Sequence, residues 1–236
     1  LVRDRTVSVM GFAFGRVTSL AYGVAMAMGN LALMIVLSTS PVQAQTMTLA
    51  ALGDSLTQGY GLPPEDGFVP QLQAWLTGQG ADVSVLNAGV SGDTTAGGLA
   101  RVGWTLTPDV DAMIVALGGN DFLRGIDPEN SKSNLRGILE AAQQAGVEVL
   151  LVGITSSNNY GPDYKAAFDG MYQDLATEFG VALYPNFFSG LLDLGEEREA
   201  LMRFMQGDGI HPNAEGVSLI VEALGPDVLA LLDRAG

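Results

Sequence analysis

A serine and a histidine far apart in the chain could form a nucleophile and its base. His211 is the only histidine in the sequence, and Ser55 follows an apolar segment in the string Gly53-Asp54-Ser55-Leu56. An imidazole can accept the proton of a serine hydroxyl and so activate the oxygen for attack on a carbonyl. Asp208 precedes His211 by three residues, so its carboxylate can reach the imidazole across one turn and stabilise the imidazolium. These residue types predict nucleophilic acyl transfer.

Neither residue identifies a site by itself. Asp and Ser often cap a helix, and a lone histidine is more often a surface or core residue than a catalytic one. The residue two positions after Ser55 is Thr57, so the G-x-S-x-G elbow of α/β-hydrolases is absent. His211, however, lies in a loop of Asp, Gly and Pro before the last expected helix, where a sheet-edge site could receive it.

Two further residues are suited to stabilise an oxyanion. Gly92 lets a backbone N–H approach a reacting carbon, and the amide of Asn120 donates a hydrogen bond without titrating. Taken singly, Gly92 could be a turn glycine and Asn120 a loop cap. Both follow expected strands, which favours a shared role. We expect Asp121 and Asp54 to brace their loops rather than to act chemically.

The composition excludes several other kinds of site. The chain has no cysteine, which rules out thiol nucleophiles, thiolate metal sites and disulfides. One histidine cannot build the usual zinc hydrolase site. The formal net charge of -15 argues against binding to nucleic acid or to an anionic membrane. The expected partner is a small-molecule substrate, and the oligomeric state stays open.

The first 44 residues have the features of an export signal. Arg3, Arg5 and Arg16 precede a stretch with no charged residue before Asp54, and small residues stand near its end. The pattern predicts a signal peptide over 1–44, cleaved before Gln45, and an exported, periplasmic protein. The alternative is an uncleaved membrane anchor, since 17–39 is long enough to span a bilayer.

The rest of the chain, 45–236, is predicted to be a single α/β domain. Short apolar runs alternate with amphipathic stretches, which is typical of a parallel sheet covered by helices on both faces. Five runs, each apolar on both faces as buried strands require, are expected at 47–52, 83–87, 112–117, 147–154 and 181–184. Helices are expected at 68–77, 95–106, 131–145, 163–179 and 213–232, the last interrupted near Gly225-Pro226.

The loops after the strands are the expected place for a site. Ligands of open parallel sheets bind beyond the carboxyl ends of the strands, where the strand order reverses. The loops with Ser55, Gly92 and Asn120 each follow an expected strand, so all three should lie at one edge of the sheet. The region 187–207 is less regular, and its charged stretch 196–199 is expected to be a solvated helical face.

Four blocks occur in one order: Gly53-Asp54-Ser55-Leu56, Gly92, Gly118-x-Asn120-Asp121 and Asp208-x-x-His211. In this the chain resembles the SGNH or GDSL hydrolases, from 48 to about 223. The longer strings "ALGDSLTQGYGL" and "DGIHPNAEG" are similar to the bacterial periplasmic branch of arylesterase, acyl-CoA thioesterase I and lysophospholipase L1. The resemblance implies a flavodoxin-like three-layer α/β/α sandwich with a five-stranded parallel sheet, periplasmic secretion and no metal or organic cofactor.

The resemblance also implies a role for each block. Ser55 would be the nucleophile, with Asp208 and His211 completing a triad. The oxyanion hole would consist of the N–H groups of Ser55 and Gly92 and the side chain of Asn120. The implied reaction is hydrolysis of carboxylic esters, and of acyl thioesters, through an acyl-serine intermediate.

Two loops would border the acyl group. They contribute Phe122 and Leu123 from 122–126, and Asn159 and Tyr160 from 155–161, as expected substrate-binding residues. The second loop reads "TSSNNYG" and departs from the family branch before Asn159, so the preference for acyl length is open.

Three other functions are compatible with this fold. A carbohydrate O-deacetylase would use the same serine chemistry, although the Leu and Phe content of the loops weighs against a sugar. A non-catalytic periplasmic binding protein would not need a serine, a histidine, a carboxylate and two oxyanion donors. A flavodoxin would bind a flavin phosphate at the first strand-helix loop and would be coloured.

Overall fold

The computed structural model describes residues 46–195 and 201–236. The expected export signal at 1–44 and the charged stretch at 196–199 therefore lie outside the described residues. Five parallel strands form one sheet in the order β2-β1-β3-β4-β5. They are β1 (Met47–Gly53), β2 (Val83–Gly89), β3 (Ala112–Ala116), β4 (Glu148–Val152) and β5 (Ala182–Tyr184). This order is that of flavodoxin-like sheets and reverses at β1 and β3.

The three central strands are buried, whereas the two edge strands are partly exposed. All residues of β3 are buried, as are the last five residues of β1. In β2 the side chains of Ser84, Leu86 and Asn87 are exposed, because only one neighbouring strand and partial helix cover protect this edge. The expectation that all five strands are buried on both faces was therefore wrong for β2 and β5.

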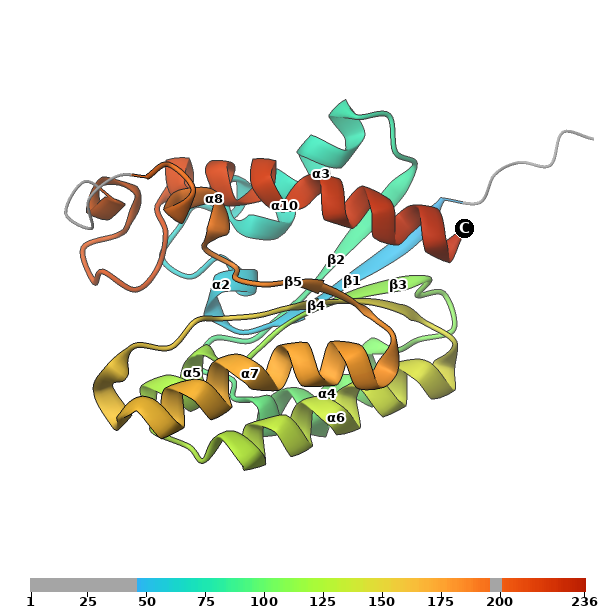
Figure 1. Cartoon of the computed structure of the whole chain (residues 1–236). Helices are drawn as coiled ribbons and strands as arrows, with labels where there is room; N and C mark the ends of the chain where they lie inside the picture. Colours follow the sequence, from blue (N-terminus) through green and yellow to red (C-terminus); the bar gives the residue numbers. More distant parts are fainter. Residues whose placement is uncertain (1–45, 196–200) are drawn as a thin grey trace, which may run out of the picture. The chain divides into compact units, whose positions relative to one another are not determined.

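Helices cover both faces of the sheet, as predicted (Figure 1). One layer contains α3 (Phe68–Gly78), α8 (Ser189–Leu192) and α10 (Ala214–Ala235), and the other contains α4 (Thr95–Thr105), α6 (Pro128–Ala145) and α7 (Pro162–Phe179). Successive residues of β1 point to opposite faces, so Leu49 and Ala51 join one core and Ala50 and Leu52 join the other. None of the helices within the described ranges is long and apolar enough to cross a membrane.

Helix starts depend on capping more than on hydrophobic period. Helix α6 begins at Pro128, three residues before the predicted start. Asp127 caps it by accepting a hydrogen bond from the N–H of Glu129 at 3.0 Å, and proline suits the first helical position. The described chain also contains the short segments α2 (Ser55–Gln58), α5 (Gly119–Leu123), η1 (Pro64–Asp66), η2 (Asn158–Tyr160) and η3 (Met202–Phe204).

Helix α10 continues through Pro226, so the predicted interruption was wrong. Its buried face runs unbroken from Val217 through Leu224 to Leu232. Gly225 lies against Trp75 of α3 so closely that a Cβ there would be 2.6 Å from the indole ring. This packing outweighs the local preference of proline to end a helix.

The contact between α8 and α10 predicts a glycine requirement at Gly190. A Cβ there would lie 2.4 Å from the backbone oxygen of Leu219, which cannot move without displacing α10. We expect Gly190→Ala to lower the free energy of unfolding by roughly 1–3 kcal/mol in urea denaturation.

Gly170 of α7 is the matched control, because a Cβ there meets no atom within 4 Å. Gly170→Ala should raise the free energy of unfolding by roughly 0.5–1 kcal/mol. Equal effects of the two substitutions would contradict the close approach of α8 to α10.

Candidate active site

Ser55 lies at the point where β1 turns into α2. Asp54 caps this short helix by accepting a hydrogen bond from the N–H of Leu56 at 3.0 Å. A Cβ at Gly53 would lie 1.9 Å from Thr57 Oγ1, so only glycine allows the chain to turn this sharply. Ser55 is the first helical residue, and its N–H has no acceptor among the described residues. The hydroxyl and the N–H of one residue are thus both placed beyond the sheet edge.

His211 connects Ser55 to Asp208. Its Nε2 lies 2.8 Å from Ser55 Oγ, and its Nδ1 lies 2.6 Å from Asp208 Oδ2. The other oxygen of Asp208 accepts hydrogen bonds from the backbone N–H groups of Ile210 and His211. The ring of Tyr60 packs against the imidazole with 4.8 Å between centroids. The structure therefore brings together the three residues that the sequence singled out.

The hydrogen bonds that Asp208 accepts keep it charged. The His211 side chain, followed by the two backbone N–H groups, lowers the pKa of this carboxyl to about 2. Asp208 is consequently ionised throughout the neutral range. An ionised carboxylate at Nδ1 holds the proton on that nitrogen and leaves Nε2 free to accept the proton of Ser55.

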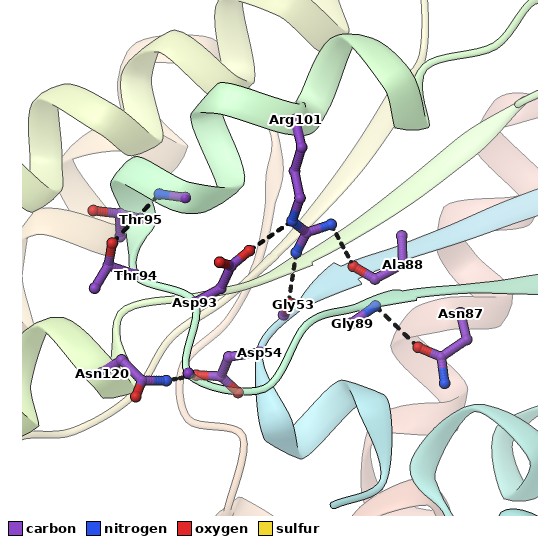
Figure 2. A network of polar contacts seen from close by, with 12 residues as sticks. Gly53, Asp54, Asn87, Ala88, Gly89, Asp93, Thr94, Thr95, Arg101 and Asn120 are labelled. Carbon is purple, nitrogen blue, oxygen red and sulfur yellow. Dashed lines mark hydrogen bonds and ion pairs between the residues drawn. The ribbon is translucent and has the colours of Figure 1, made fainter.

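Gly92 and Asn120 reach the same place from the neighbouring strands. Gly92 follows β2 with a φ of 84°, and its N–H has no acceptor among the described residues. Its carbonyl oxygen accepts a hydrogen bond from Arg124 Nη2 at 2.7 Å. Asn120 belongs to α5 after β3, and its amide donates to Asp54 Oδ2 at 3.2 Å (Figure 2). Both residues line one cavity with Ser55 and His211.

Asp121 braces the loops, as predicted from the sequence. It is fully buried, and its carboxylate accepts hydrogen bonds from the N–H and hydroxyl of Thr95 at 2.8 and 2.6 Å and from the hydroxyl of Ser131 at 2.9 Å. These bonds tie α5 to the beginnings of α4 and α6. Asn120, the preceding residue, is therefore carried on a helix whose position is fixed from two sides.

The cavity beside Ser55 has a volume of about 440 Å³. Phe122 and Leu123 line it, whereas Asn159 and Tyr160 do not. The ring of Tyr160 packs edge-on against Phe122, behind the wall, and its hydroxyl donates to the backbone oxygen of Leu123. The remaining wall combines the polar groups described above with apolar side chains that include Leu56, Tyr60, Ile154, Phe188 and Ile210.

Sequence reasoning missed most of this apolar wall. Tyr60 had a recognisable signal in the sequence, because it stands between Gly59 and Gly61, and two such glycines indicate a tight turn, where both have a positive φ. Ile154 and Phe188 had no local signal, since they approach the cavity from the loop after β4 and from the start of α8 only in the folded chain.

The arrangement is suited to acyl transfer. It combines a hydroxyl with an imidazole and a charged carboxylate, and it places donors beside an apolar cavity that could hold the rest of a substrate. Within 46–195 and 201–236, no group of three or more His, Cys, Asp or Glu side chains could hold a metal ion.

Comparison with known sequences shows extensive similarity. The model of the GDSL-like Lipase/Acylhydrolase family matches residues 51–219. The chain is 39% identical over 191 residues to esterase TesA of Pseudomonas aeruginosa, which covers 80% of this chain and 92% of that protein. It is 37% identical over 189 residues to thioesterase 1/protease 1/lysophospholipase L1 of Escherichia coli K12, covering 79% of this chain and 86% of that protein.

The fold is also similar to the solved structure of TesA. The crystal structure of TesA matches with a TM-score of 0.71 and 38% sequence identity, covering 78% of this chain and 99% of that chain. The match agrees with the five-stranded parallel sheet and its two helical layers, so the expected α/β sandwich with five parallel strands is confirmed.

The buried carboxyl of Asp54 predicts a pH effect on stability. Burial is the main cause that raises its pKa from 3.8 to about 6 in the folded chain. Because the pKa is higher in the folded than in the unfolded state, Asp54 stabilises the fold below pH 3.8, and this contribution is lost as the pH rises through 6. We expect the loss to be roughly 2–3 kcal/mol.

The measurement is urea denaturation of the unmodified chain and of Asp54→Asn at several pH values between 4 and 8. As the pH rises, the free energy of unfolding of the unmodified chain should fall relative to that of Asp54→Asn, because an amide at this position cannot ionise. Parallel pH profiles for the two proteins would contradict the raised pKa.

Proposed function

Since the chain belongs to the GDSL-like lipase/acylhydrolase family, we propose that Ser55, His211 and Asp208 are its catalytic triad and hydrolyse carboxylic esters and acyl thioesters. The observation that carries the assignment of these residues is the continuous path from Ser55 Oγ through both ring nitrogens of His211 to Asp208, with separations of 2.8 and 2.6 Å. Such a path joins a nucleophile, a base and an orienting carboxylate.

The reaction proceeds in two acyl-transfer steps. Nε2 of His211 takes the proton from Ser55 Oγ as this oxygen attacks the carbonyl carbon. The tetrahedral intermediate collapses when the leaving alkoxide or thiolate departs with that proton, which leaves an acyl-serine. A water molecule then gives a proton to His211 and attacks the acyl carbon, and His211 returns the proton to Ser55 as the acid is released.

The negative charge on the tetrahedral oxygen is stabilised by the N–H groups of Ser55 and Gly92 and by the amide of Asn120. The positions of these groups around one cavity, and the lack of an acceptor for both N–H groups among the described residues, support this assignment. Asn120 retains a second amide hydrogen for the oxyanion while its first is directed to Asp54.

The apolar wall of the cavity supports an acyl chain as the group held beside Ser55. Side chains such as Leu56, Ile154 and Phe188 offer no hydrogen bonds to sugar hydroxyl groups, which makes an O-deacetylase the weaker alternative. Phe122 and Leu123 form part of the same wall and take the role of acyl-contacting residues. Tyr160 acts through its contacts with Phe122 and Leu123, which support this wall.

The proposal extends to export of the protein. Three arginines before a long uncharged segment support a signal peptide over 1–44, cleaved before Gln45, followed by a single hydrolase domain over 45–236. Processing at this site would place the domain in the periplasm. Mass spectrometry of the protein recovered after expression with its natural N-terminus would locate the cleavage.

Ser55→Ala should abolish turnover of p-nitrophenyl acetate and covalent labelling by an organophosphonate, because the attacking oxygen is removed. The control is Ser133→Ala, which removes an exposed hydroxyl on α6, and it should leave both unchanged. Labelling of Ser55→Ala at the unmodified rate would overturn the assignment of the nucleophile.

His211→Ala should lower kcat by several orders of magnitude, because the chain then lacks a base beside Ser55. Asp208→Asn should lower kcat by roughly 10²–10⁴-fold, since an amide does not hold the proton on Nδ1. Steady-state kinetics with p-nitrophenyl acetate checks both. A loss of less than about tenfold for His211→Ala would be incompatible with general-base catalysis.

A further inference from the structure

We propose that Arg101 is a positioning residue for the oxyanion hole, which it holds in shape without contacting the substrate. This inference rests on the proposed function, because it assigns Arg101 to the loop that carries Gly92 and to the turn that carries Ser55. Arg101 belongs to α4 and is not among the residues that line the cavity.

The guanidinium of Arg101 joins three segments that are separate in the sequence (Figure 2). Its Nε donates to Asp93 Oδ2 at 2.6 Å, its Nη1 to the backbone oxygen of Ala88 at 2.7 Å, and its Nη2 to the backbone oxygen of Gly53 at 2.8 Å. Gly53 ends β1 immediately before Asp54 and Ser55, and Ala88 is the last residue but one of β2. One side chain therefore fixes the ends of both strands and the loop that follows the second.

The positions of these acceptors tie Arg101 to the two backbone donors of the oxyanion hole, the N–H groups of Ser55 and Gly92. Asp93 follows Gly92 directly, and the carbonyl oxygen of Gly53 also accepts a hydrogen bond from the N–H of Val90 at 3.1 Å. The short segment from Val90 to Asp93 is thus held at both ends, against β1 at the first residue and against α4 at the last. Gly92 needs this support because its backbone has a positive φ, and a glycine without such contacts can adopt many other backbone conformations.

The side chain of Arg101 is closely packed and partly buried. A Cβ at Gly97 of α4 would lie 2.4 Å from Asp93 Oδ1, so the helix passes directly beside the carboxylate that Arg101 binds. The side chains of Arg101 and Asp93 are 23% and 19% exposed, which makes this pair more protected than a surface ion pair. The planar guanidinium offers donors in several fixed directions, whereas a lysine ammonium cannot match all three acceptors in the same geometry.

The hydrogen bonds of Arg101 should affect the stabilisation of the transition state. Oxyanion donors contribute only if they are already aimed at the developing charge, and a misplacement of about 1 Å can cost on the order of 10²-fold in rate. Because Arg101 does not line the cavity, its loss should leave binding of the ester ground state largely unchanged. The expected signature is a lower kcat at a nearly constant KM.

The first test compares Arg101→Met with the matched control Arg136→Met, both in the full chain and with p-nitrophenyl acetate as substrate. Arg136 forms a two-bond ion pair with Glu178 between α6 and α7 and is not among the residues that line the cavity. Arg101→Met should lower kcat by roughly 10–100-fold with KM changed less than about threefold. Arg136→Met should keep the unmodified kcat. Equal kcat values for both variants would overturn the proposal.

A second measurement separates positioning from loss of folded protein. Titration with an organophosphonate counts reactive sites, and kcat is then expressed per labelled site. The proposal requires a low kcat per labelled site in Arg101→Met, whereas an unchanged kcat per labelled site would show a merely structural role and overturn it. The milder Arg101→Lys keeps the charge, and its kcat per labelled site should lie between those of the unmodified chain and Arg101→Met. It replaces Arg101→Met in the test if that variant does not fold.

Chemical rescue completes the design. Arg101→Ala leaves space for a free guanidinium ion, so millimolar guanidinium chloride should raise its kcat several-fold, and sodium chloride at the same ionic strength should not. Equal responses to the two salts would contradict the requirement for a guanidinium at this position. Failure of the proposed function is distinguishable, because then the unmodified chain would not be labelled by the phosphonate or Ser55→Ala would retain activity.

Discussion

The end of β1 is the constraint on which the site depends. A Cβ at Gly53 would lie 1.9 Å from Thr57 Oγ1 and 3.0 Å from the backbone oxygen of Ala116. Its own carbonyl oxygen accepts hydrogen bonds from Val90 and Arg101. The turn into Ser55, the end of β3 and the loop with Gly92 are therefore packed around one peptide without a side chain, and a displacement there would move all three.

The base reaches this junction from the opposite end of the chain. An isolated bridge between Met205 and Pro212 closes the His211 loop, and the side-chain amide of Gln206 spans it by donating to the backbone oxygens of Pro212 and Tyr60. Tyr60 follows Ser55 by five residues and packs on the imidazole. The hydrogen bond between His211 and Ser55 is thus supported on both sides by contacts that hold their two loops together.

Two carboxylates that line the cavity, Asp208 and Asp54, have pKa values shifted in opposite directions because their surroundings differ. Asp208 is partly exposed and accepts three hydrogen bonds, which lower its pKa to about 2. Asp54 is 2% exposed, and burial raises its pKa to about 6 although Leu56 and Asn120 donate to it. Two carboxyl groups whose pKa values are so far apart are suited to different roles. Asp208 is suited to orient the base, and Asp54 to hold Asn120.

The sequence by itself determined the strands, the sheet edge with Ser55, Gly92 and Asn120, and the pairing of Asp208 with His211. These features rest on hydrophobic period or on spacings of a few residues, which are local properties of a chain. Only the tertiary structure decided that α10 runs through Pro226, that Tyr160 lies behind the cavity wall, and that Arg101 and Gln206 join distant loops. Each of these depends on contacts between residues far apart in the sequence, whose free energy no local pattern records.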